Sequence, residues 1–479
     1  MYSHKSNLLI KSLVSFVALF ILFYWFTYSS VSPLAPTSIP VHHDDYTNYA
    51  ARFQNISLYV RPLSTLLITA LSTLGPNTLI WSIRLLTVLY LLLCLTLFSR
   101  IYGKRYQWVY CACFTVITFS LPVVVEYARY TGMITHLISG CLGISAVILL
   151  QKAFAEDKAH LAWLSAGTLL LSVLAKEDFL ILYGLSYCYF FRVVSTSKKV
   201  RVIGFTPLPV SALLILIFKT LTPTSFLGVI DSSSTYFINI TPISIVQTVI
   251  TYLSGANPAL VSTHGNIVIS VVLAIILLAF FVKNKLSHQS LYFLGCTISV
   301  ILPYALLPNH INSYYEYLWA PFIVFSAYLA LISVLNKTRV IKHSEMIVII
   351  LFSVASVFIY NLEMPARKSI ATWYDARGME NSRILDKIKN VAAHASTADV
   401  VCVIGAGPFS PWFMHDGRYL EYVIDAHNKW RLYLPTTETS LNDGFALGAT
   451  ASKGRFSLLP EASLAMDQCK TLLDLRVAS

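Results

Sequence analysis

The chain has 479 residues, of which 56% are hydrophobic and only 12% are charged. A soluble domain usually carries about a quarter charged residues, so this composition excludes an ordinary soluble enzyme and indicates a protein with several membrane spans. The net charge of +12 comes largely from Lys and Arg in short loops between apolar runs. That distribution is the positive-inside pattern, and it argues against nucleic-acid binding.

Apolar runs of roughly 20 residues, long enough to cross a hydrocarbon core of about 30 Å, recur along the chain. We expect about eleven spans. They fall near residues 8–28, 77–98, 107–125, 131–151, 160–175, 178–192, 201–220, 264–282, 289–307, 317–335 and 344–361. Placing the basic loops in the cytoplasm puts the N-terminus inside and the C-terminus outside. The loops 29–76 and 221–263 then face outward, and the first should contain helices that lie along the membrane surface.

The first external loop holds two adjacent carboxylates, Asp44 and Asp45, and later Arg61. A carboxylate in a partly dry pocket has a raised pKa and accepts a proton from a hydroxyl. The alternative for the pair is the N-cap of the helix that follows. Arginine is a preferred ligand for phosphate, although an Arg at the membrane surface is also common without any ligand.

Three consecutive charges, Lys176, Glu177 and Asp178, separate two apolar runs with almost no linker. Each would cost about 2.5–3.5 kcal/mol at the membrane centre, so they belong at the outer surface or in a polar cavity. A simple turn between two spans is one explanation. However, a single Lys on the outer side runs against the positive-inside rule, which favours a partner or ligand for Lys176.

Two further external segments carry candidate residues. Arg129 follows Glu126 by three positions, so the two side chains share a helix face and either pair with each other or serve a site. His310 is either a phosphate donor or an exposed loop residue. Tyr315 belongs to a tyrosine cluster at residues 314–317, for which an aromatic belt at the membrane interface is the default interpretation.

Residues 362–479 have ordinary polarity and are predicted to form a small soluble α/β domain. Helical periodicity over 380–393 precedes a strand-like run over 399–404. Cys402 and Cys469 can pair if this domain faces an oxidising compartment. The glycines at 405 and 407 lack the third glycine of a dinucleotide fingerprint, so we expect no nucleotide cofactor.

This arrangement resembles the GT-C glycosyltransferases, polytopic enzymes that use lipid-phosphate-linked sugars. The resemblance covers most of residues 1–361 in topology and rests on the segments at 41–46, 61–63, 176–178 and 310–317. It implies an all-α membrane bundle whose active site lies on the non-cytoplasmic face. It also implies a catalytic carboxylate in the first external loop, either Asp44 or Asp45.

The same resemblance implies a polyprenyl-phosphate-sugar donor and a glycan, lipid or protein acceptor. Its phosphate- and substrate-binding candidates are Arg61, Arg129, Lys176, Glu177, His310 and Tyr315. Some members hold a divalent metal beside the carboxylate, so a metal at Asp44 and Asp45 stays open. We expect the bacterial inner membrane with the C-terminus in the periplasm, with the endoplasmic reticulum and a lumenal C-terminus as the alternative.

Two other functions compete with this one. A polysaccharide polymerase or ligase would act on lipid-linked glycans and would rely on Arg and His in late loops. A transporter or flippase would more typically show inverted repeats and ionisable groups near the membrane midplane. We find no internal repeat, and the charged groups lie near the ends of the predicted spans.

Overall fold

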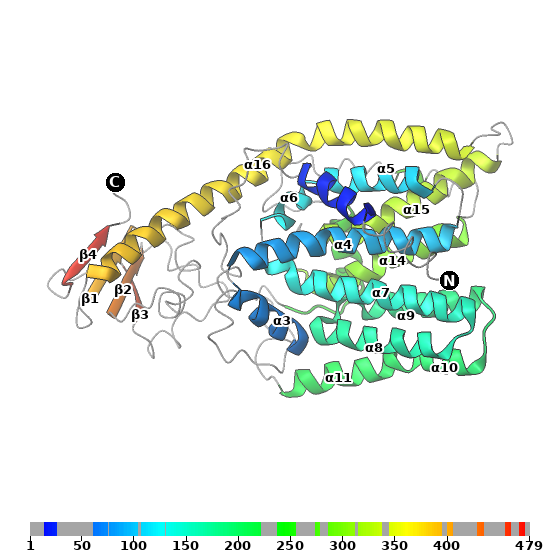
Figure 1. The fold of residues 1–479 in the computed structure, drawn as a ribbon, viewed down its shortest axis with the longest axis horizontal. Coiled ribbons are helices and arrows are strands. Elements are labelled where there is room, and N and C mark those ends of the chain that lie inside the picture. Colours follow the sequence, from blue (N-terminus) through cyan, green and yellow to red (C-terminus); the bar gives the residue numbers. More distant parts are fainter. Residues whose placement is uncertain are drawn as a thin grey trace.

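The computed structural model describes residues 14–25, 61–74, 76–103, 107–129, 131–221, 237–254, 274–277, 286–311, 315–337, 344–394, 400–405, 429–434, 456–460 and 469–474. Asp44 and Asp45 lie outside these residues, as does most of the 221–263 loop. The described chain is dominated by helices gathered in one bundle, with a small group of strands beyond one end of it (Figure 1).

The helices of the described chain up to residue 221 follow one another with short connections. In chain order, the helices are α3 (Pro62–Thr73), α4 (Pro76–Tyr102), α5 (Gln107–Ser120), α6 (Val123–Tyr127), α7 (Ile134–Glu156), α8 (Ala159–Ala175), α9 (Leu180–Val193), α10 (Lys198–Phe205), α11 (Pro207–Leu221), α12 (Pro242–Ser254), α14 (His288–Ala305), α15 (Glu316–Lys337) and α16 (Ser344–His394). Two short 3-10 turns, η2 (Thr131–Met133) and η3 (Glu177–Phe179), precede α7 and α9.

Five helical segments of the described chain are long and apolar enough to cross a membrane: Thr78–Tyr102, Ile134–Glu156, Lys198–Ile217, Glu316–Leu335 and Met346–Thr372. Each coincides with one of the predicted spans. Other predicted spans, such as those at 160–175 and 178–192, are helices of only 17 and 14 residues. The described residues therefore support a helical membrane protein. They contain five segments of spanning length, fewer than the eleven predicted spans.

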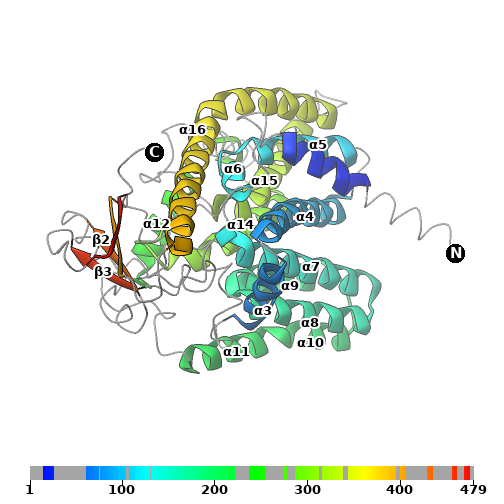
Figure 2. The ribbon, with the colours of Figure 1, turned by 60° about the vertical axis from the view of Figure 1, so that its left-hand side comes forward.

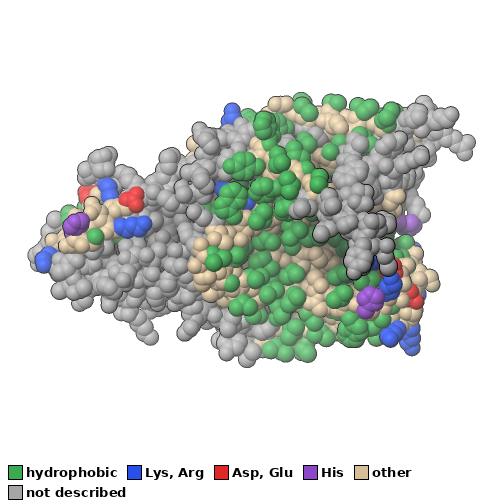
Figure 3. Space-filling view, in the orientation of Figure 1, with side chains coloured by type: hydrophobic (Ala, Val, Ile, Leu, Met, Phe, Trp, Pro, Cys, Tyr) green, Lys and Arg blue, Asp and Glu red, His purple; other side chains and the backbone are tan. Residues whose placement is uncertain are grey.

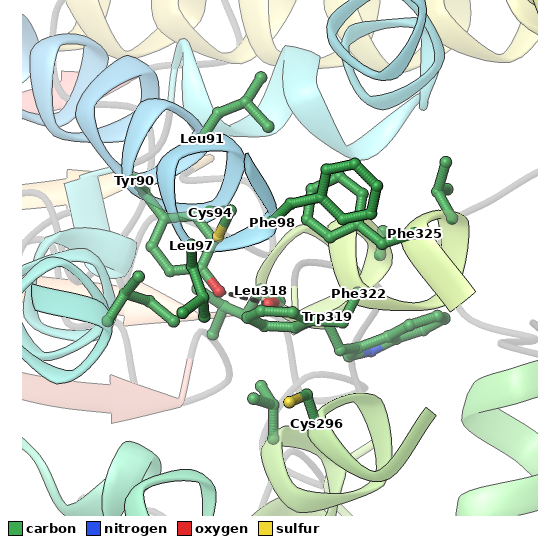
Figure 4. Close-up of a cluster of buried hydrophobic side chains, with 14 of the residues drawn as sticks. Tyr90, Leu91, Cys94, Leu97, Phe98, Cys296, Leu318, Trp319, Phe322 and Phe325 are labelled. Carbon is green, nitrogen blue, oxygen red and sulfur yellow. Dashed lines mark hydrogen bonds between the residues drawn. The ribbon is translucent and has the colours of Figure 1, made fainter. Parts of the chain in front are cut away.

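The core of the bundle forms where α4 packs against α15 (Figure 4). The rings of Phe98 and Phe325 lie with their centroids 4.5 Å apart. Hydrogen bonds also join these two helices. The Tyr317 hydroxyl donates to the Thr87 carbonyl at 2.8 Å. The Tyr90 hydroxyl likewise donates to a backbone carbonyl of α15. In a membrane bundle such aromatic packing and interhelical hydrogen bonds hold helices together, since burial in lipid alone does not.

The surface of the bundle separates into an apolar flank and a charged end. Hydrophobic side chains cover the flank, and charged side chains gather at the right-hand end (Figure 3). There, the Arg100 guanidinium donates to Gln151 at 3.4 Å, and Thr196 donates to Asp157 at 2.6 Å. These contacts bring together the ends of α4, α7 and α9. We refer to this region, with Lys152 and Lys158, as the basic end.

Helix α16 links the bundle to the strands. It has 51 residues with Pro365 inside it, and it runs along the bundle before extending past it (Figures 1 and 2). The strands β1 (Val400–Ile404), β2 (Lys429–Leu434), β3 (Phe456–Pro460) and β4 (Thr471–Asp474) form a parallel sheet in the order β3-β2-β1-β4. A disulfide joins Cys402 to Cys469, so the two cysteines considered from the sequence are paired.

Candidate functional site

The end of the bundle opposite the basic end contains a buried ionic cluster around Lys176. This residue separates α8 from η3 in an extended conformation, with φ −170° and ψ 147°. Both backbone polar groups of Lys176 are hydrogen-bonded: its N–H donates to the Ser172 carbonyl at 2.8 Å, and its carbonyl accepts from the Ser139 hydroxyl at 2.6 Å. The break in the helix therefore carries the ammonium inward, where Lys176 is only 8% exposed.

His136, in the first turn of α7, connects Lys176 to Asp178. Its Nε2 lies 2.6 Å from the Lys176 Nζ, and its Nδ1 lies 2.6 Å from Oδ2 of Asp178. An ammonium group only donates hydrogen bonds, so Nε2 accepts, and Nδ1 carries the hydrogen that it donates to the carboxylate. The ammonium is 3.9 Å from the same carboxylate oxygen. The three side chains thus form one connected unit that we call the Lys176 cluster.

Asp178 carries the negative charge of this cluster. Burial opposes its ionisation, but Lys176, His136 and hydrogen bonds from His136 and Tyr304 outweigh that effect and hold the pKa of Asp178 below its usual range. Asp178 is therefore ionised at neutral pH. The hydroxyl of Tyr304 also lies 2.9 Å from Nδ1 of His136.

Arg61 reaches the same region through α3. It immediately precedes α3, in which the Ser64 hydroxyl donates to the Ala175 carbonyl at 2.8 Å. Ala175 is the neighbour of Lys176, so this bond docks the start of α3 onto the Lys176 cluster. Arg61 is close enough to act electrostatically on His136. The structure therefore brings together two cations that are more than a hundred positions apart in the chain.

His310 and Tyr315 lie beside the Lys176 cluster. The Tyr315 ring stacks on Tyr304 with centroids 3.7 Å apart, and its centroid is 5.1 Å from that of His136. The Tyr315 hydroxyl is 3.2 Å from Nε2 of His310. Tyr252 of α12 donates to the backbone carbonyl of His310 at 3.3 Å. An aromatic wall thus borders the ionic groups.

Two other predicted site residues have different positions. Among the described residues, it is Asp178 and not Glu177 that contacts His136, and Glu177 is only half-buried. Arg129 is buried after α6, where the adjacent Ala128 carbonyl accepts from the Arg84 guanidinium at 3.0 Å. Arg129 also lies in electrostatic range of Arg367 on α16. It therefore belongs to a second charged region, next to α16.

His136 and Tyr304 are the site residues that reasoning from the sequence missed. A histidine in the first turn of an apolar span is the signal that was available for His136, because ionisable groups inside membrane helices are costly and usually functional. Within the described ranges, no group of three or more His, Cys, Asp or Glu side chains is arranged to hold a metal ion. Asp44 and Asp45 fall outside those ranges.

Comparison of the chain with protein-family models and with curated protein sequences finds no match.

Proposed function

We propose that the protein is a membrane glycosyltransferase of the GT-C type. In this proposal residues 1–361 form a catalytic module of about eleven spans, and residues 362–479 form a small α/β domain on the non-cytoplasmic side. The enzyme moves a sugar from a polyprenyl-phosphate donor to a hydroxyl of a glycan, lipid or protein acceptor. It resides in the bacterial inner membrane or, alternatively, in the endoplasmic reticulum.

The observation that carries this proposal is the Lys176 cluster with Arg61 beside it. Of the residues described there, two are cations, Arg61 and Lys176, and one is an ionised carboxylate, Asp178. The excess positive charge suits an anion with a single negative charge, such as the phosphodiester of a sugar linked to a lipid phosphate. The Lys176 cluster is buried, so the local dielectric constant is low and the attraction between its cations and that anion is stronger.

The residues account for each part of an inverting transfer. The acceptor oxygen attacks the anomeric carbon while the bond from that carbon to the phosphate oxygen breaks. The phosphate leaves with the electron pair, and Lys176 and Arg61 stabilise its charge, an effect often worth several kcal/mol. Asp44 or Asp45 takes the proton of the acceptor hydroxyl. The donor is already activated by its phosphate, so no nucleotide has to be bound.

The proposal is tested with protein reconstituted in proteoliposomes and a panel of radiolabelled polyprenyl-phosphate sugars. Lys176→Met should lower the rate of sugar transfer by about 100-fold or more, because a charge that stabilises the leaving phosphate is lost. Asp44→Asn or Asp45→Asn should abolish transfer. Lys158→Met, at the exposed basic end, is the matched control and should transfer at the wild-type rate.

Full transfer by a correctly inserted Lys176→Met protein would contradict the proposal. Transfer only from an oligosaccharide-diphosphate lipid would favour a polymerase or ligase. Movement of the lipid-linked sugar across the membrane without a covalent product would favour a flippase.

A further inference from the structure

A second group of buried polar side chains lies where α5, α15 and α16 meet. Glu363 and Thr118 are both 0% exposed. Neither carboxylate oxygen of Glu363 has a hydrogen-bond partner among the described residues, and the same holds for the Thr118 hydroxyl and for Oε1 of Glu316. Most buried polar groups in folded proteins are paired, so each of these groups requires an explanation.

The fold brings these three residues into one region. Glu363 lies one helical turn before Arg367 on α16, and the Arg367 guanidinium donates to the carbonyl of Phe119, the residue after Thr118. This contact joins α16 to the end of α5. Glu316 begins α15 and lies within electrostatic range of Glu363. We call Thr118, Glu316 and Glu363 the Glu363 site.

The chemistry of the Glu363 site calls for a ligand that donates hydrogen bonds. Carboxyl groups accept hydrogen bonds in either protonation state, and a hydroxyl such as that of Thr118 both accepts and donates. A buried acceptor left unpaired costs about 1–3 kcal/mol, and more when it is charged. A molecule with several adjacent hydroxyl groups would supply the missing donors.

Charge decides between a cation and a neutral ligand. Carboxyl and guanidinium groups are equally numerous in this region among the described residues: Glu126, Glu316 and Glu363 against Arg84, Arg129 and Arg367. The region therefore has no excess negative charge that a bound cation would balance. A neutral polyol can donate hydrogen bonds to the unpaired carboxyl and hydroxyl oxygens without changing the net charge of the region. A cation would add a buried charge without compensation.

We propose that the Glu363 site binds a neutral sugar ring, with Glu363 accepting hydrogen bonds from two vicinal hydroxyl groups and with Thr118 and Glu316 bonding to others. Glu316 directly follows Tyr315, whose ring stacks on Tyr304 and lies 5.1 Å from that of His136, centroid to centroid. The sugar site therefore adjoins the Lys176 cluster, as a donor with a sugar next to its phosphate requires. The sugar's part in a transfer reaction rests on the proposed function, whereas its binding does not.

The experiment measures thermal unfolding of the full-length protein in nanodiscs, which contain no sugar detergent. Free glucose, galactose, mannose and arabinose are added separately at about 100 mM, and at least one should raise the Tm of the wild type. Glu363→Gln, which replaces one acceptor oxygen by a donor, should reduce that affinity by about tenfold or more. Thr118→Val should weaken it as well, while Glu156→Gln at the basic end should bind like the wild type.

The unliganded proteins provide a second measurement. Thr118 loses no hydrogen bond to the described residues when it is replaced, so Thr118→Val should fold with an unchanged or higher Tm in the absence of sugar. Glu363→Gln also removes the charge that acts on Arg367, so its sugar-dependent shift is measured from its own unliganded Tm. The proposal is overturned if no sugar raises the wild-type Tm, if the shift persists in both variants, or if KCl or ammonium chloride stabilises the protein and sugars do not. Sugar binding that depends on Glu363 without any transfer from polyprenyl phosphates would refute the proposed function and leave this site in place.

Discussion

Lys176 and Asp178 together determine the chemistry at the end of α8. The extended backbone at Lys176 turns the ammonium inward, and the following 3-10 turn presents Asp178 to the same imidazole. His136 stabilises both buried charges, because it accepts a hydrogen bond from the Lys176 ammonium and donates one to the Asp178 carboxylate. Breaking a buried pair of this kind typically costs about 3–5 kcal/mol, since the remaining charge is left without compensation.

Asp178→Asn should therefore destabilise the protein, and the effect should depend on pH. The pKa of Asp178 is lower in the folded protein than the value of about 3.9 for an unfolded chain. Its ionised form thus stabilises the fold at all pH values above about 4, and this contribution is lost as the pH falls through the folded pKa. Thermal unfolding in nanodiscs should show a constant difference in Tm between wild type and Asp178→Asn from about pH 5 to 8, which narrows below about pH 4.

Glu177→Gln serves as the neighbouring control and should change the free energy of unfolding by no more than about 0.5 kcal/mol. A difference between wild type and Asp178→Asn that stays constant down to about pH 2 would show that Asp178 does not contribute through its charge.

At the scale of elements, glycines on α7 determine how closely its neighbours approach. A Cβ atom at Gly143 would lie 2.5 Å from the Cβ of Phe179, and one at Gly140 would lie 2.8 Å from the Tyr90 ring. Small residues of this kind let membrane helices pack closely. Because Phe179 follows Asp178 directly, the absence of a side chain at Gly143 allows η3 to hold Asp178 against His136.

Gly143→Ala should consequently destabilise the protein and slow the proposed sugar transfer. An Ala in a helix gains about 1 kcal/mol over Gly, but overpacking costs about 1–3 kcal/mol, and Phe179 can relieve this contact only by moving η3. Gly167→Ala on α8 is the matched control, since its Cβ would meet nothing within 4 Å and the change should be neutral or stabilising. Equal Tm values for the two variants would mean that the packing of α7 against η3 does not limit stability.

The whole molecule has two chemically different ends. Basic loops meet at one end, and the Lys176 cluster and the long arm of α16 lie toward the other (Figure 1). Anionic lipids and the insertion machinery retain Lys- and Arg-rich loops in the cytoplasm. A disulfide such as that between Cys402 and Cys469 is typical of proteins in oxidising compartments. Both features support the orientation that the proposed function requires.

Cysteine labelling tests this orientation. A Lys389→Cys variant places a thiol on the exposed part of α16 that leads to the strands, and Lys158→Cys places one at the basic end; the exposed Cys188 is first replaced by Ala. A membrane-impermeant maleimide should label Lys389→Cys in intact cells and should label Lys158→Cys only after permeabilisation. The reverse pattern would invert the orientation and place the Lys176 cluster on the cytoplasmic side.

The sequence by itself determined the properties that follow from local composition. Hydropathy located the helices that later proved long enough to span a membrane, and charge predicted which loops would be basic. The isolated triplet at 176–178 was predicted to lie at the outer surface or in a polar cavity, because charges between two apolar runs carry a large desolvation cost. These inferences succeed because each depends on residues that are neighbours in the chain.

Only the tertiary structure determined which side chains meet. His136 contacts Asp178 across 42 positions and Tyr304 across 168, and Glu363 gains its place beside α5 through a contact that spans 248 positions. The same packing assigned Arg129 to the region of α16 and Arg61 to the Lys176 cluster. Such contacts depend on how whole helices pack, a property that hydropathy and spacing along the chain do not encode.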